Sequence, residues 1–216
     1  MALRPHYPSP EARSADFLVH IVGICLTVLG GVVLLWLGIQ DPNPGKLTVL
    51  AIYSLGAIAM FGFSTAYNFS PARWQPFLRR LDHGGIFLMI AATFTPFTGY
   101  LLSGSWAWML TGGLWALAGL GIVGKLLLPS IGQKAWVPVY LGIAWIGAIA
   151  AFPLAGVTSV LVLALLGLGG LLYSAGVAFH LNKRLQYAKA IWHGHVLVAA
   201  ASHWAAVLFG LLLVRS

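Results

Sequence analysis

Three pairs of polar side chains stand near the ends of long apolar runs, and the members of each pair are four residues apart. The pairs are Asp16 with His20, Ser64 with Asn68, and Lys189 with His193. Residues four apart share one face of an α-helix, so each pair presents two polar groups to the same neighbour. Carboxylate, imidazole and hydroxyl groups held together could bind a metal ion or transfer a proton. Asp82 and His83, at the start of another apolar run, offer the same chemistry.

The composition places these residues in a membrane protein. The chain of 216 residues is 60% hydrophobic and only 7% charged, whereas soluble domains carry about 25% charged residues. The net charge of +8 comes from basic residues between the apolar runs. Such residues orient helices, so nucleic acid is not an expected partner. The only cysteine, Cys25, lies inside the first run, which excludes an intrachain disulfide and a thiolate metal cluster.

Seven apolar stretches are long enough to span a membrane, since a helix needs about 20 residues to cross ~30 Å of hydrocarbon. The sequence therefore predicts an all-α integral membrane protein, a single domain formed by a seven-transmembrane-helix bundle. Pro96 is expected to kink the third helix, and the residues from Gly167 to Gly170 are expected to permit close helix packing. The segment before the first helix is expected to be a disordered tail. The expected helices cover about residues 17–39, 47–68, 82–102, 106–127, 134–152, 157–180 and 190–214.

The basic residues predict an orientation for this bundle. Ten of the twelve Lys and Arg residues lie in the amino-terminal tail or near the loops after the second, fourth and sixth helices, while Lys46 and Arg215 lie on the other side. The positive-inside rule then predicts a cytoplasmic amino terminus and an external carboxyl terminus. All the polar pairs fall in the cytoplasmic leaflet in this orientation. His203 lies further along the last helix than His193, about 15 Å deeper at 1.5 Å per residue.

Six segments form a recognisable pattern when they occur together in a seven-helix protein. In chain order they are Glu11-Ala-Arg-Ser-Ala-Asp16 with His20, Phe63-Ser64-Thr-Ala-Tyr67-Asn68, Arg80-Leu-Asp82-His83-Gly-Gly-Ile86, Ala92-Thr-Phe-Thr-Pro96-Phe97, Ala190-Ile-Trp192-His193 and Ser202-His203-Trp204. Over nearly the whole chain, this pattern resembles the hemolysin III branch of the progestin and adipoQ receptor family. The resemblance implies a multi-pass protein of a bacterial inner membrane, similar in plan to the alkaline ceramidases.

The resemblance also implies a zinc ion near the cytoplasmic face. Its ligands would be one histidine on the second helix and two on the seventh, with an aspartate of the third helix beside a zinc-bound water. Ser64, Asp82 and His193 match this pattern, but Asn68 and Lys189 stand where two of the histidines belong. One of three zinc ligands therefore remains, because an amide is a weak ligand and an ammonium is none.

We interpret Lys189 as a fixed cation in place of the metal. In this hypothesis Lys189 pairs with Asp82 and hydrogen-bonds with Asn68 and His193, and its charge keeps the carboxylate ionised and repels a dication. No cofactor is then expected, and zinc bound through His193 is the alternative. His195 does not replace a lost ligand, because two residues along a helix place it nearly opposite His193.

These residues also have simpler interpretations. Lys189 can extend to the membrane surface as one more cytoplasmic anchor, and His193 and His203 can be interhelical hydrogen-bond partners without chemistry. Asp82 can pair with a neighbouring arginine. The expected polar cluster has three further members, Asp16, His20 and His83. The family pattern gives His20 and His83 no role in the zinc site, but either histidine could contribute a ligand in place of a lost one.

Three functions from different classes are compatible with the sequence. The first is a receptor-like or membrane-homeostasis protein whose metal-free polar site binds or senses a membrane lipid. The second is a zinc-dependent, ceramidase-like lipid amidase or hydrolase, with Asp82 as general base and Ser64 beside it. The third is an ion or proton pathway or a pore, supported by the depth of His203. The number of remaining zinc ligands favours the first function.

Overall fold

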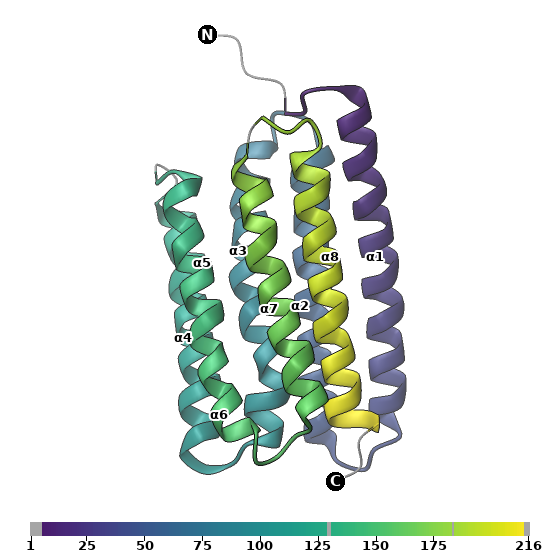
Figure 1. The fold of residues 1–216 in the computed structure, drawn as a ribbon, viewed down its shortest axis with the longest axis vertical. Coiled ribbons are helices and arrows are strands. Elements are labelled where there is room, and N and C mark those ends of the chain that lie inside the picture. Colours follow the sequence, from purple (N-terminus) through teal and green to yellow (C-terminus); the bar gives the residue numbers. More distant parts are fainter. Residues whose placement is uncertain (1–5, 129–130, 183, 214–216) are drawn as a thin grey trace.

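The computed structural model is an all-helical bundle, and it describes residues 6–128, 131–182 and 184–213. Within these ranges the chain forms no β-strand, and seven helical spans are long and apolar enough to cross a membrane (Figure 1). The predicted fold class is therefore confirmed. Four residues used in the sequence predictions lie outside the described residues. They are the basic residues Arg4, Lys183 and Arg215, and Val214, where the last helix was expected to end.

Three of the seven spans are built from more than one helical segment. The third span continues from α3 into a π-helix, the fifth passes through a short 3₁₀ segment, and the seventh ends as a π-helix. In chain order, the elements are α1 Pro10–Ile39, α2 Pro44–Phe69, α3 Gln75–Thr95, η1 Pro96–Leu101, α4 Gly104–Leu127, α5 Gln133–Gly147, η2 Ala148–Ala150, α6 Ala151–Leu154, α7 Val160–Leu181, α8 Ala188–Val207 and η3 Leu208–Leu213.

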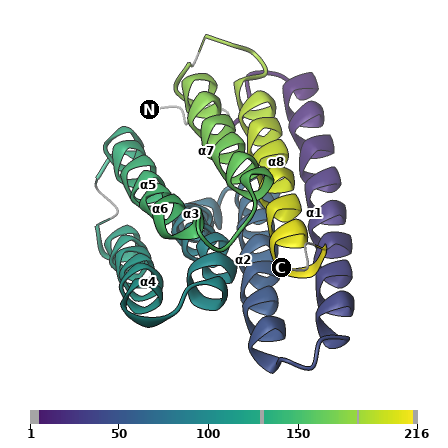
Figure 2. The same ribbon diagram turned by 60° about the horizontal axis from the view of Figure 1, so that its bottom comes forward.

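The helices form a main body and a hairpin beside it. Helices α7, α8 and α1 lie side by side with α2 and α3 behind them, and α4 and α5 stand next to α3 (Figures 1 and 2). A large apolar core around Leu34, Leu50 and Phe61 fills the main body. A second core around Phe87 and Trp136 attaches the hairpin to α3.

Local sequence signals explain where the helices begin. The Ser9 hydroxyl accepts a hydrogen bond from the Ala12 amide at 3.2 Å, and Pro10 occupies the first helical position. A serine cap followed by proline favours a helix start, so α1 begins at Pro10 and not near Phe17. The expected disordered tail is therefore wrong for the residues that α1 adds, and also for His6, which the structure places against the bundle.

Pro96 changes the third span as its position predicts. The chain passes from α-helix to π-helix at this residue, because proline cannot donate the backbone hydrogen bond that continues an α-helix. Hydroxyl groups compensate nearby: Thr95 donates to the Ala91 carbonyl at 2.8 Å, and Thr98 donates to the Phe94 carbonyl at 3.1 Å. The π-helical segment places the buried Phe97 ring in the core.

Candidate functional site

Four helices bring polar side chains together at one end of the bundle. This is the end at which α1, α3 and α8 begin and α2 ends, and we call it the polar end. Hydrogen bonds join six of the residues that the sequence singled out, and we call these six the polar cluster. They are Asp16 and His20 on α1, Ser64 and Asn68 on α2, and Lys189 and His193 on α8.

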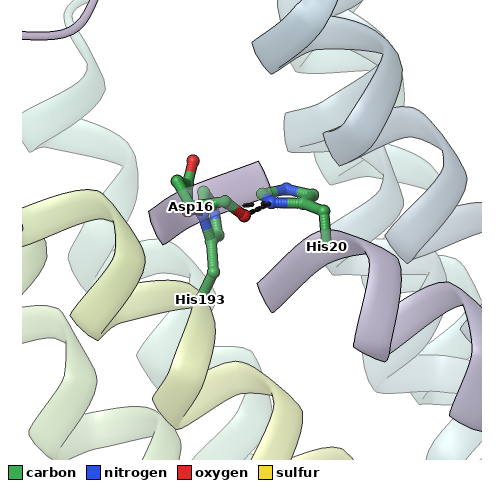
Figure 3. A group of neighbouring side chains, drawn as sticks. All are labelled: Asp16, His20 and His193. Atoms are coloured by element: carbon green, nitrogen blue, oxygen red, sulfur yellow. Dashed lines mark hydrogen bonds and ion pairs between the residues drawn. The ribbon is translucent and has the colours of Figure 1, made fainter. Parts of the chain in front are cut away.

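Asp16 is the centre of this cluster. Its side chain is 0% exposed, so its carboxylate requires polar partners inside the protein. One oxygen accepts a hydrogen bond from His193 Nδ1 at 2.6 Å, and the other accepts from the Tyr7 hydroxyl at 2.5 Å. The rings of His20 and His193 meet edge to face, with centroids 4.4 Å apart (Figure 3).

His20 connects Asp16 to the second helix. Its Nδ1 lies 2.8 Å from the backbone carbonyl of Asp16, and a carbonyl can only accept, so Nδ1 carries the proton. Nε2 is then the acceptor, and it receives the Ser64 hydroxyl at 3.2 Å. The Asn68 amide donates to the Ser64 carbonyl at 3.0 Å, which orients the Asn68 oxygen toward α8.

Lys189 meets that oxygen. Its ammonium lies 3.1 Å from Asn68 Oδ1 and 2.7 Å from His6 Nε2, and the Tyr7 ring lies beneath it at 4.4 Å. The expected bond to Asn68 is present. The expected ion pair with Asp82 is not among those of the described residues, and His193 bonds with Asp16 and not with Lys189. The cause is α1, whose carboxylate lies within reach of α8.

The segment before α1 closes the polar end, which the sequence did not indicate. His6 contacts Asn68 and Lys189, and Tyr7 donates to Asp16 and stacks on Phe69 with ring centroids 6.0 Å apart. Gln186 holds the same segment through the Ser9 hydroxyl at 3.0 Å. The prolines around these residues could have indicated a stiff segment, but only the tertiary structure shows where it lies. We call His6–Ser9 the strap.

The surroundings of the strap shift the pKa values of two of its residues. Burial and the neighbouring Lys189 ammonium lower the pKa of His6, and burial together with Asp16 raises the pKa of Tyr7. Both residues are therefore uncharged at neutral pH. A neutral imidazole suits this place, because a charged His6 would repel the ammonium that it touches.

The strap is expected to weaken as the pH falls. The pKa of His6 is lower in the folded protein than the ordinary value of about 6.5. When the pH falls below about 6.5, the unfolded chain therefore binds more protons than the native protein, so acid favours unfolding. The His6→Gln variant keeps a polar side chain but cannot titrate. Between pH 7.5 and pH 5.5, we expect the Tm of wild type to fall by about 1–3 °C more than that of His6→Gln in detergent. An equal decrease in both proteins would contradict this role of His6.

The other residues expected at the site lie around the polar cluster or away from it. Asp82 and His83, on α3, line a cavity that begins at the cluster. Ser64 lines the same cavity. His195 points elsewhere and bonds with the Ile191 carbonyl at 2.8 Å, which agrees with its expected position on the opposite face. His203 lies deeper on α8 and bonds with the Leu166 carbonyl at 3.2 Å.

The cavity has a volume of about 300 Å³ and runs through the middle of the bundle. Its walls come from α1, α2, α3, α5, α6, α7 and α8, and they are mostly apolar away from the polar end. Among its described lining residues, Lys189 and Asp82 are the only ones of the types Lys, Arg, Asp and Glu. Trp145 lines the cavity and is also 45% exposed, so it forms a thin outer wall. Its indole donates to Ser174 on α7 at 3.2 Å.

Comparison with known proteins gives the same family along most of the chain. A family model described as haemolysin-III related matches residues 14–204. The chain belongs to the hemolysin III family. It is 30% identical to "Hemolysin-3 homolog" of Bacillus subtilis (strain 168) over 196 residues, covering 90% of this chain and 92% of that protein. It is also 30% identical to "Hemolysin-3" of Bacillus cereus over 199 residues, covering 92% and 91% of the two chains. With seven membrane-length spans, it is a multi-pass integral membrane protein.

The zinc pattern expected from the hemolysin III resemblance does not fit the side chains at its own positions. Lys189 brings an ammonium to the place of one ligand, and the Asn68 amide accepts from that ammonium at 3.1 Å. A different group of three could hold a metal ion: donor atoms of Asp16, His20 and His193 lie within 4.8 Å of one another. As placed, these residues are hydrogen-bonded, since 2.6 Å between His193 and Asp16 is shorter than the separation of about 3.3 Å between two ligands of one tetrahedral zinc.

Proposed function

We propose that this hemolysin III family protein binds a single-chain amphiphilic lipid and serves in lipid sensing or membrane homeostasis. The observation that carries this proposal is the cavity, which begins at the polar cluster and continues between apolar walls. Its volume of about 300 Å³ is that of a small-molecule site. A carboxylate head of the ligand would lie against the Lys189 ammonium, and its chain would lie along α7 and α8.

The outer wall of the cavity supports entry from the membrane. Trp145 and Ser174 form a hydrogen bond between α5 and α7 at the outer wall of the cavity. One hydrogen bond at this wall can break without disturbing the apolar core of the bundle. A lipid that enters here leaves the strap closed.

We further propose that the polar site works without a metal. The support is chemical: Lys189 already supplies a positive charge, which would repel a dication, and its ammonium bonds with Asn68 and His6. A zinc-dependent lipid hydrolase is the second candidate, and the observation that favours it is the group formed by Asp16, His20 and His193. Metal analysis separates the two. Stoichiometric zinc that is lost in His193→Ala and kept in His195→Ala would overturn the metal-free site.

A glycine on the cavity wall allows a direct test of lipid binding. Gly170 lines the cavity, and a β-carbon added there meets no atom within 4 Å. Gly170→Leu should therefore fill the cavity without distorting the helices. We expect it to weaken binding of a fluorescent fatty-acid analogue by about tenfold or more, the effect of about 1.4 kcal/mol.

The matched control for this variant is Gly119→Leu. Gly119 also has open space around it but does not line the cavity. The Gly119→Leu variant should bind the fatty-acid analogue as wild type does. Equal affinity in Gly170→Leu and Gly119→Leu would contradict a ligand inside the bundle. Lys189→Met, compared with Lys46→Met at the opposite end, then tests whether the ammonium holds the carboxylate head.

We propose that the polar end faces the cytoplasm of a bacterium, with the chain in its inner membrane. The distribution of basic residues supports this orientation. In a Cys25→Ser background, a cysteine in place of Ser105 should react with an impermeant maleimide in intact spheroplasts. A cysteine in place of Ala72, which is exposed near the polar end, should react only after permeabilisation. The reverse result would invert the topology.

A further inference from the structure

Beyond the polar cluster, two neighbouring side chains of the cavity wall each carry a polar atom without a hydrogen-bond partner within the described part of the chain. The atoms are Nδ1 of His203 and the hydroxyl of Tyr173, and both atoms are buried. Both rings line the cavity, and their centroids are 5.7 Å apart. A buried polar group without a partner costs about 1–3 kcal/mol. The two atoms together therefore offer a place for a polar group that the described chain does not supply.

The hydrogen bond at Nε2 of the His203 ring determines whether a ligand group at Nδ1 must donate or accept. Nε2 lies 3.2 Å from the Leu166 carbonyl, which can only accept, so Nε2 carries the proton of the neutral ring. Nδ1 is then an acceptor. The Tyr173 hydroxyl, in contrast, can donate. A group that donates to one atom and accepts from the other satisfies both, and an alcohol hydroxyl has this property.

The position of His203 depends on a glycine in the facing helix. A β-carbon at Gly169 would lie 2.2 Å from His203 Nε2, so a larger residue there would displace the ring. The glycine run predicted to permit close packing thus makes room for a polar ring that is only 8% exposed. The cavity wall also contains apolar residues, such as Val196 and Leu166.

We propose that His203 and Tyr173 form a subsite for a hydroxyl group on the apolar chain of the bound lipid. The inference rests on the proposed lipid-binding function and names its ligand class, a hydroxylated acyl chain. His203 lies about 15 Å along α8 from His193, taking 1.5 Å per residue. The head of such a lipid would lie at the polar cluster, and the hydroxyl would lie part-way down the chain, donating to His203 Nδ1 and accepting from Tyr173.

Two fatty acids that differ by one hydroxyl test this proposal. Ricinoleic acid carries a hydroxyl within its chain, and oleic acid is the same chain without it. Each would compete with a fluorescent fatty-acid analogue on purified full-length protein. Wild type should bind ricinoleic acid about tenfold more tightly, as expected for one satisfied pair of buried polar atoms. Tyr173→Phe and His203→Leu should each reduce this ratio to within about twofold.

The control is Tyr53→Phe. The Tyr53 hydroxyl is also buried, but it bonds with the Ala200 carbonyl at 3.4 Å and does not line this cavity. Tyr53→Phe should keep the tenfold ratio. Equal binding of the two fatty acids by wild type would overturn the hydroxyl subsite while leaving the lipid-binding function intact. Binding of neither fatty acid would overturn the lipid-binding function and the subsite with it.

Discussion

Asp16→Ala is expected to lower the free energy of unfolding by about 3–5 kcal/mol, the usual cost of breaking a buried charge pair by removing one partner. The carboxylate is 0% exposed and accepts from His193 at 2.6 Å and from Tyr7 at 2.5 Å. Alanine leaves both donors unpaired and removes the hydrogen bond that joins Tyr7 of the strap to α1. Unfolding in mixed micelles, followed by circular dichroism, measures the loss.

Two comparisons assign this loss to the polar cluster. Asp41 pairs with Lys46 at the opposite end of the bundle and is more exposed, so Asp41→Ala should leave the unfolding midpoint close to that of wild type. In a double-mutant cycle, Asp16→Ala and His193→Ala should cost about 1–3 kcal/mol less together than the sum of the single effects. Additive effects would show that the two residues do not stabilise each other.

The apolar runs predicted the seven spans because the membrane demands continuous hydrophobicity, whereas the helix ends follow other rules. Helix α3 begins at Gln75 and not near Asp82, and it includes Arg79 and Arg80. Arginine is a good helix former in water, and its charge is unfavourable only within hydrocarbon. Hydropathy therefore marks the part of a helix inside the membrane, while caps such as Ser9 determine where the helix starts.

The candidate site was predictable in its members but not in its partners. Spacing along one helix indicates that Lys189 and His193 share a face, because that depends on the helix alone. Which carboxylate His193 meets depends on how α1 packs against α8, and the sequence favoured Asp82 over Asp16. The strap depends even more on tertiary contacts. Nothing local to His6 indicates that it touches residues on α2 and α8.

Changing Asn68 and Lys189 together to histidine is expected to create a zinc site where wild type holds an ammonium. The two side chains come from different helices and meet at 3.1 Å, so imidazoles at these positions would converge. With His193 they would supply three histidines, the ligand number of a zinc site that keeps one position for water. We expect about one zinc per chain in Asn68→His/Lys189→His, measured by elemental analysis after dialysis.

Zinc should also stabilise this double variant, by about 4 kcal/mol at a free concentration 1,000 times the Kd. Asn68→His combined with Lys46→His adds the same two histidines but places one at the opposite end of the bundle, so it should bind zinc no better than Asn68→His alone. His193 can bind the metal through Nε2 while Nδ1 keeps its hydrogen bond to Asp16. Replacing Asp16 with alanine should therefore weaken zinc binding by the double variant. A double variant that folds and retains no zinc would show that Asn68, Lys189 and His193 do not converge on one point.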